Sequence, residues 1–321
     1  MVVKKGIFVV YFPKAAVIIL TTNALAMTKE ELSDVAKLET KGLKATCVVV
    51  DNDSSDGTEA ALKNYRLPNM DYRFIKSGAN LGFAGGNNVG IKYALKNKFD
   101  YVLLLNNDVI LAKDLLVKLV SFMEENPRAG LVSPKMYFAK GYEFHKDRYK
   151  VSELGKVFWY AGGIIDRKNA YFFHRGVDEI DRGQYDRIES TDFANGACVL
   201  IRRAVLTKVG LLDASFFLYC EDADFSEKAK KAGFEIYYYP KTAMWHKVSA
   251  STGGSGSPSN DYFLIRNRFY FARRYLPFRT KLAVIKDTLR LIITGRIWQK
   301  RGALDALLGR KGMGSWRPGV K

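Results

Sequence analysis

Short apolar runs alternate with amphipathic segments along the first 130 residues of the chain. Strands are expected where about four to eight apolar, often β-branched residues follow one another, and helices where apolar positions recur every three or four residues. Such alternation is typical of a mostly parallel sheet covered by helices. The predicted strands are residues 16–20, 46–51, 72–76 and 101–105, and the predicted helices are residues 28–41, 57–64, 87–97 and 113–125.

The pattern changes after residue 138. Aromatic strands such as residues 157–165 and polar loops such as residues 175–190 predict an antiparallel region. Residues 216–233 form an apolar run followed by a helix with acids at its start and lysines at its end, as the helix dipole favours. Residues 249–260 are rich in Ser, Gly and Pro, which fits either a linker or a mobile lid.

The charge of the chain is concentrated at one end. The 51 Lys and Arg and 33 Asp and Glu give a net charge of +18, and residues 261–321 alone contribute +12, from 15 basic and 3 acidic residues. We therefore expect two parts, residues 1–260 and a basic helical extension over residues 261–321. The extension is expected to form either one or two amphipathic helices at an anionic membrane surface or a helix that packs its apolar face on the main part.

Signals for export or membrane insertion are weak. Pro13 and Lys14 interrupt the apolar N-terminus and no small-residue cleavage site follows, so two short strands are expected there. No segment reaches the roughly 18 uninterrupted apolar residues of a spanning helix. Cys47, Cys198 and Cys220 are too scattered for a disulfide framework and fit a reducing compartment. We expect a cytoplasmic protein, peripheral at the inner face of the cell membrane.

Polar residues follow the predicted strands, where ligands bind in open α/β sheets. Residues 46–50 run into Asp51, whose carboxylate can accept hydrogen bonds from a uracil or thymine imide or from a ribose. The segment that follows, which includes Asp53, also fits a turn and a helix cap. A cap would use Ser54 or Asp56 and leaves Asp51 unexplained.

A glycine-rich segment comes next. Asn80, Gly85 and Gly86 lie where a helix begins, and there glycines allow close backbone approach to a ligand while helix-start amides favour phosphate. The segment is neither a dinucleotide fingerprint nor a phosphate loop. A purely structural role for these residues stays open.

The apolar strand at residues 101–105 ends in Asn106, Asn107 and Asp108. A divalent cation that bridges a diphosphate takes one or two oxygen ligands from protein and leaves the others to water and phosphate. Asp108 fits that task, and a plain turn at the strand end fits the segment equally well.

Three acids, Glu221, Asp222 and Asp224, follow an aromatic run. Capping and the helix dipole account for one or two acids, whereas three acids beside an apolar wall favour a general base. His246 follows a predicted strand and is either structural or a ligand. His145 and His174, in polar loop surroundings, are interpreted as structural.

Taken in order, these segments resemble the family 2 glycosyltransferases, inverting enzymes of the GT-A fold, and in particular the rhamnosyltransferase-like and galactofuranosyltransferase-like branch. The resemblance covers about residues 16–269. It depends on the ordered set rather than on any single motif, namely residues 48–58, 80–90, 103–108, 196–202, 209–213 with 221–225, and 245–247. It implies an α/β GT-A fold with a mostly parallel nucleotide-binding sheet, an antiparallel acceptor side and the basic helical extension.

Residue by residue, the resemblance implies that Asp222 is the catalytic base and that Asp108 and His246 hold Mg²⁺ or Mn²⁺. Asn106 occupies the position of the first acid in the family's Asp-x-Asp-like motif, so the site has one charge fewer. The implied contacts to the nucleotide-sugar donor are Thr21, Asn23, Asp51, Asp53, Asn80, Gly85, Gly86, Asn106 and Asn107, with residues 196–198 below the sugar.

The implied reaction transfers a sugar from dTDP-rhamnose or a UDP-sugar to a hydroxyl of a glycan or lipid-linked acceptor, in cell-surface polysaccharide synthesis. The expected partners are this donor, this acceptor and an anionic membrane surface. A nucleotide-sugar-binding protein without catalysis is an alternative. A nucleic-acid-binding protein is a weaker one, because the basic residues lie mainly outside the α/β part and no nucleic-acid motif is present. The oligomeric state does not follow from the sequence.

Overall fold

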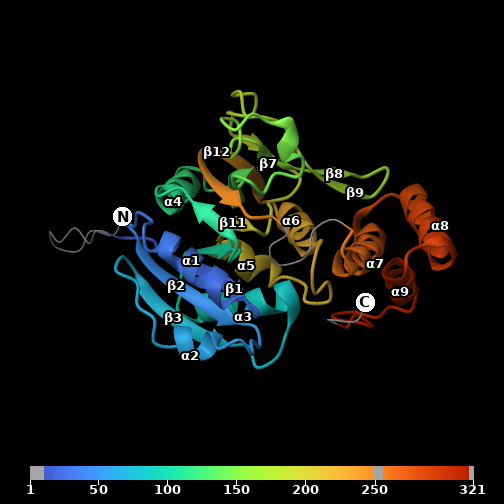
Figure 1. Ribbon diagram of the computed structural model, residues 1–321, viewed down its shortest axis with the longest axis horizontal. Coiled ribbons are helices and arrows are strands. Elements are labelled where there is room, and N and C mark those ends of the chain that lie inside the picture. The colour runs from blue at the N-terminus through green and yellow to red at the C-terminus, as the bar shows by residue number, and fades with distance from the viewer. Residues whose placement is uncertain (1–10, 249–255, 318–321) are drawn as a thin grey trace.

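The computed structural model describes residues 11–248 and 256–317 and centres on a twisted sheet (Figure 1). Within these residues the sheet has ten strands, in the order β10-β12-β6-β11-β4-β1-β2-β3, with β5 and β7 paired to β12 and β6. The strands are β1 (Lys14–Thr21), β2 (Lys44–Asp51), β3 (Asp71–Lys76), β4 (Tyr101–Leu105), β5 (Val109–Leu111), β6 (Ala129–Phe138), β7 (Phe158–Tyr160), β10 (Glu189–Ser190), β11 (Cys198–Arg202) and β12 (Glu235–His246).

One half of the sheet is parallel and the other half is mixed. β4, β1, β2 and β3 run parallel, so their carboxyl ends meet at one edge. β11 runs antiparallel to β4 and to β6, while β6 and β12 are parallel to each other. A separate antiparallel hairpin is formed by β8 (Gly163–Asp166) and β9 (Tyr171–His174).

Both faces of the sheet are buried, which explains why its central strands are continuous apolar runs rather than alternating ones. Odd positions of β1 pack with α1 (Leu25–Val35) and α4 (Leu115–Glu125). Even positions of β1 pack with the opposite layer of helices, which is α3 (Gly82–Lys96), α5 (Arg203–Val209) and α6 (Glu221–Lys231).

The predicted strands agree with β1 to β4 to within two residues at each end, but some helix limits were wrong. The helix predicted at residues 28–41 is α1, which ends at Val35, and the helix predicted at residues 57–64 is the short α2 (Thr58–Leu62). The strand predicted at 157–165 is broken into β7 and β8, because Gly162 adopts a φ of 116° between them. Part of the extra N-terminal strand lies outside the described residues.

The glycine-rich segment is inside α3 rather than before it. A Cβ on Gly86 would come within 2.4 Å of Leu20 Cδ1, and one on Gly90 within 2.6 Å of Ile18 Cγ2. The glycines therefore let α3 lie close against β1. The helix predicted at residues 87–97 is α3, which starts five residues earlier, at Gly82.

The C-terminal part forms α7 (Pro258–Tyr275), α8 (Phe278–Thr294) and α9 (Ile297–Leu307). The Ser257 hydroxyl caps α7 by accepting from the Asn260 amide, and Pro258 occupies its first turn. Of the predicted linker or lid at 249–260, residues 249–255 lie outside the described part, and residues 258–260 are helical. The predicted boundary after residue 260 thus falls inside α7. Within the described residues, no helix combines the length and apolar character needed to cross a membrane.

Candidate active site

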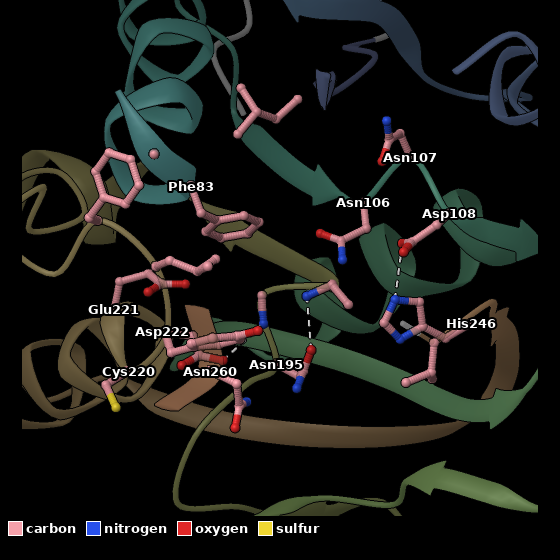
Figure 2. Close-up of a pocket in the computed structure, with 18 of the residues that line it drawn as sticks. Phe83, Asn106, Asn107, Asp108, Asn195, Cys220, Glu221, Asp222, His246 and Asn260 are labelled. Atoms are coloured by element: carbon pink, nitrogen blue, oxygen red, sulfur yellow. Dashed lines mark hydrogen bonds and ion pairs between the residues drawn. The ribbon is translucent and has the colours of Figure 1, made fainter. Parts of the chain in front are cut away.

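A pocket of about 600 Å³ opens at the edge where the parallel strands end. Its lining comes from the ends of β1 and β4, the first turns of α3 and α6, the end of β12 and the first turns of α7. Figure 2 shows Asp222 on one side of this pocket and Asp108 with His246 on the other. Of the predicted site residues, the pocket is lined by Asn80, Asn106, Asn107, Asp108, Asp222 and His246.

The Asp108 and His246 side chains meet although 138 positions separate them in the sequence. β5 starts immediately after Asp108 and pairs antiparallel with β12, in a register that sets Val109 opposite His246. The backbone N–H of Lys247 donates to the Asp108 carbonyl at 2.8 Å. The result is a distance of 3.0 Å between His246 Nε2 and Asp108 Oδ1 (Figure 2).

This pair fits a divalent cation that is shared with a substrate. Among the described residues, no group of three or more His, Cys, Asp and Glu side chains could enclose a metal ion. A carboxylate and an imidazole at the edge of an open pocket instead leave coordination positions for phosphate oxygens and water, as Mg²⁺ and Mn²⁺ prefer. His246 is buried, and its Nδ1 finds no hydrogen-bond partner among the described residues.

The two asparagines before Asp108 are held by the loop before β11 and by helix α1. The Asn106 backbone N–H donates to the Ala197 carbonyl at 2.9 Å, and Asn107 Nδ2 donates to the Thr28 hydroxyl at 3.2 Å. Both side chains line the pocket without adding charge. Asp108 is therefore the acid at this strand end and the candidate ligand for a cation.

Asp222 lies in the first turn of α6. Its Oδ1 accepts from the Ala223 N–H at 2.8 Å and its Oδ2 accepts from the Gly196 N–H at 3.2 Å. Burial raises the pKa of Asp222, and these two backbone donors oppose the rise. For its neighbour Glu221, burial and the nearby Asp222 charge raise the pKa well above the usual range. Glu221 thus holds its proton more tightly than an ordinary glutamate does.

The third acid of this cluster has a different task. Asp224 is fully buried, and its carboxylate pairs with Arg274 at 2.7 Å and accepts from the Tyr275 hydroxyl at 2.8 Å, both on α7. Lys228 adds a further pair at 2.7 Å. Asp224 therefore ties α6 to α7 and does not line the pocket, which leaves Asp222 as the candidate base.

The loop before α6 is held in an unusual backbone conformation. Phe217, Tyr219 and Cys220 have φ values of 65°, 67° and 69°, a left-handed region that costs a non-glycine residue about 1–3 kcal/mol. On α7, Asn267 Nδ2 donates to the carbonyls of Phe216, Leu218 and Tyr219 at 2.7–2.9 Å. The guanidinium of Arg266, also on α7, donates to the Phe216 carbonyl at 2.8 Å. Helix α7 thus positions the segment that presents Asp222.

At the opposite end of the sheet edge, Asp51 ends β2 beside Thr21 of β1. The Asp51 side chain is fully buried. Its Oδ1 accepts from the Ser54 N–H at 3.0 Å, while its Oδ2 has no hydrogen-bond partner among the described residues. Such an acceptor is costly to bury unless a ligand satisfies it, which fits the predicted contact with a nucleobase or ribose. Asp51 itself is not part of the pocket lining.

The other predicted donor contacts have mainly structural partners. Thr21 bonds the Thr28 hydroxyl at 2.7 Å, and Asn23 Oδ1 accepts from the Ser55 N–H at 2.7 Å. Asp53 is exposed in a turn with a φ of 72°. These three residues, and likewise Gly85 and Gly86 inside α3, do not line the pocket.

Sequence reasoning missed several residues that do line it. Asn52 donates to Asn80 Oδ1 at 3.1 Å and accepts from the Leu81 N–H at 3.0 Å, which fixes the loop before α3. His174, interpreted as structural, also faces the pocket, between the Trp159 carbonyl and Asn195. Burial lowers the pKa of His174 to about 4. The sequence signal for His174 was the alternation of side-chain directions along β9. Tyr171 and Phe173 are exposed on one face of this strand, and His174 lies on the other face.

Comparisons with known proteins point to a family and to a fold. The sequence profile of glycosyl transferase family 2 matches residues 16–210. The low-salt glycan biosynthesis hexosyltransferase Agl10 of Haloferax volcanii is 26% identical over 226 residues, which is 70% of this chain and 66% of that protein. The N-acetylglucosaminyl-diphospho-decaprenol L-rhamnosyltransferase of Mycobacterium tuberculosis is 28% identical over 217 residues, or 64% of this chain and 67% of that one. The chain thus spans about two thirds of the length of these relatives.

A solved structure with the same fold is the mannosyltransferase PcManGT from Pyrobaculum calidifontis, in complex with GDP-Man and Mn²⁺. It superposes with a TM-score of 0.55 at 18% identity, over 93% of this chain and 75% of that chain. This likeness confirms the predicted GT-A fold.

Proposed function

The chain belongs to glycosyl transferase family 2, and from that premise we propose that it is a metal-dependent inverting glycosyltransferase. It moves a sugar from a nucleoside diphosphate to a hydroxyl of a glycan or lipid-linked acceptor. The observation that carries the proposal is the juxtaposition across one pocket of a carboxylate with a raised pKa, Asp222, and a cation-binding pair, Asp108 with His246.

The donor occupies the sheet edge in this proposal. Asp51 offers its unpartnered, buried Oδ2 to the nucleobase or ribose. The Asn52–Asn80 contact holds the loop at the start of α3, and Asn106 and Asn107 line the pocket that the donor would enter. When a divalent cation is bound at Asp108 and His246, it supplies positive charge to the diphosphate oxygens.

Asp222 then removes the proton from the acceptor hydroxyl. The oxygen of that hydroxyl attacks the anomeric carbon, and the bond from this carbon to the diphosphate oxygen breaks with the nucleoside diphosphate as leaving group. A single displacement inverts the anomeric centre. The backbone N–H groups of Gly196 and Ala223 orient the Asp222 carboxylate throughout, and Trp159 and Phe193 form an apolar part of the pocket wall.

The relatives support a role in glycan assembly. One of them acts in glycan biosynthesis and the other transfers rhamnose to a lipid-linked diphosphate acceptor, as their names state. We therefore propose dTDP-rhamnose as the first donor to test, with UDP-sugars next, and a glycan or polyprenyl diphosphate saccharide as acceptor in cell-surface polysaccharide synthesis.

The test replaces Asp222 with Asn. Loss of a general base costs about 10² to 10⁴ in rate, so transfer falls by that factor. Donor binding, followed as the thermal shift produced by each nucleotide sugar with and without Mn²⁺, stays as in the wild type. Glu221→Gln is the matched control, because burial and the Asp222 charge raise the pKa of this adjacent carboxyl, and most transfer should be retained.

Near wild-type transfer by Asp222→Asn would sink the assignment of the base. Nucleotide-sugar binding without transfer to any acceptor would instead favour a binding protein. If generic DNA binds in a salt-dependent way and no nucleotide sugar produces a shift, the basic chain is a nucleic-acid-binding protein and the proposal fails.

A further inference from the structure

Helix α8 carries its apolar stripe on the side that faces away from the protein. Phe278, Leu282, Leu289 and Ile293 follow one another at intervals of four, seven and four positions and share one side of the helix. Their exposed fractions are 72%, 50%, 51% and 77%. Figure 1 shows α8 at the outer margin of the molecule, beyond α7. An amphipathic helix ordinarily buries such a stripe against its own domain.

Specific contacts set this orientation. The buried positions of α8 are Thr280, Val284 and Thr288. The Thr280 hydroxyl lies 3.0 Å and 3.2 Å from two backbone carbonyls in the turn of the β8–β9 hairpin. Asp287 accepts from Arg268 of α7 at 2.7 Å. The polar side of α8 is therefore fastened to the protein, and a simple rotation that would bury the stripe would break these bonds.

Basic residues flank the exposed stripe. Arg279 and Lys286 lie along one margin and Lys281 along the other, at the 100° spacing of an α-helix. Among the described residues these three cations have no ion-pair partner within 4.0 Å. The acid of this helix, Asp287, is engaged by Arg268 and by Arg290. The surface is thus apolar in the middle and positive at its edges.

We propose that this surface, defined as Phe278, Leu282, Leu289 and Ile293 with the flanking Arg279, Lys281 and Lys286, lies in the interface of an anionic lipid bilayer. An apolar stripe bordered by cations is the pattern of helices that lie in the plane of a membrane interface. Each cation adds attraction to anionic lipid. A second copy of the chain is a poorer occupant, because a symmetric contact would bring two sets of uncompensated cations together.

The experiment is flotation of the full-length protein with two kinds of vesicle. One is phosphatidylcholine alone, and the other is phosphatidylcholine with about 30% phosphatidylglycerol, an anionic lipid. The wild type is expected to float with the anionic vesicles at low salt. The double variant Leu289→Ser with Ile293→Ser should reduce binding at least tenfold without a change in charge. Arg279→Gln with Lys286→Gln should reduce binding to anionic vesicles and flatten its dependence on salt.

A matched control changes two exposed apolar residues elsewhere, Val151→Ser with Ile164→Ser, which are 74% and 43% exposed. The control should bind like the wild type, and Asp222→Asn should too, because vesicle binding does not depend on the proposed reaction. The inference is overturned if the wild type fails to float, or if the stripe and control variants lose binding equally. It is also overturned if sedimentation shows a dimer that the stripe variant dissociates, which would assign the surface to a second copy.

Discussion

The Asn267 side chain offers a sharp test of how the C-terminal helices serve the reaction. Its amide lies 2.7–2.9 Å from the carbonyls of Phe216, Leu218 and Tyr219, in the loop that leads to Asp222. Asn267→Asp keeps the shape of the side chain and its acceptor for Arg266 Nε. It removes both N–H hydrogens and turns a second oxygen toward those carbonyls.

The magnitude follows from the bonds that are lost. The two N–H hydrogens of the Asn267 amide are shared among three carbonyls. A buried hydrogen bond contributes about 1 kcal/mol to stability, and its loss costs about 1–3 kcal/mol when the remaining partner stays buried and unsatisfied. We expect the variant to lose about 2–4 kcal/mol of unfolding free energy. Three left-handed residues in this loop store about 1–3 kcal/mol each, so the loop should relax once the amide is gone.

Relaxation of the loop should move the first turn of α6, and with it the base. A misplacement of about 1 Å can lower a rate roughly 100-fold, so kcat should fall by about that factor. Donor binding should change little, because Asp51, Asp108 and His246 lie on other elements.

The measurements are kcat and KM for transfer, donor affinity from thermal shifts, and the unfolding free energy in urea. Asn126→Asp is the matched control. Asn126 Nδ2 also donates to a backbone carbonyl, that of Phe122, at 2.8 Å. Asn126 follows α4 and does not line the pocket. It should lose stability and keep kcat at working temperature. If Asn267→Asp keeps a wild-type kcat while it loses stability, α7 is a structural support only, and the reasoning is refuted.

Two further predictions concern the pocket. The pKa of His174 is lowered to about 4, so the folded state resists protonation of this ring. The free energy of unfolding is therefore unaffected by His174 above the usual pKa of about 6.5. It falls by up to about 3 kcal/mol as the pH is lowered toward 4. His174→Gln should flatten this part of the stability profile in urea titrations at pH 4–7, and an unchanged slope would contradict the burial argument. Asp108→Asn should abolish the Mn²⁺-dependent part of the thermal shift that the donor produces. Asp53→Asn, on an exposed turn, is the control and should leave that part intact. If both variants change the shift equally, Asp108 is not a ligand of the cation.

The central strands were predictable because both faces of the sheet are buried. Residues such as Cys47 to Val50 are then all apolar, and their run stands out from any neighbouring segment. Acids and amides after these strands could be assigned to one edge because parallel strands bring their carboxyl ends together. The start of α3 was not predictable, since Gly85 and Gly86 suggest a loop unless the contact with Leu20 is known.

Candidate site residues could be proposed where a motif lies on one segment of the sequence. Contacts between residues that lie far apart in the sequence could not be predicted. Asp108 was a candidate from its place after an apolar strand and from the resemblance, and His246 from the resemblance. Only the register of β5 on β12 shows that they touch. Glu221, Asp222 and Asp224 look alike in the sequence. Their different tasks follow from partners on α7 and at Gly196, which local pattern does not contain.

The C-terminal extension shows most clearly that a local sequence pattern does not reveal which segments a helix packs against. Its periodicity predicted one or two amphipathic helices, and the described residues form three, α7, α8 and α9. The periodicity could not tell which way each apolar stripe points: α7 buries Phe263 and Phe271, whereas α8 exposes Leu289 and Ile293. A truncation at residue 270 would cut α7 in its middle and remove the Arg274 partner of Asp224. Loss of membrane binding in such a protein could therefore come from a collapsed catalytic loop. Point variants on the exposed side of α8 separate the two effects, because that side makes none of the contacts that hold α7 to the loop before Asp222.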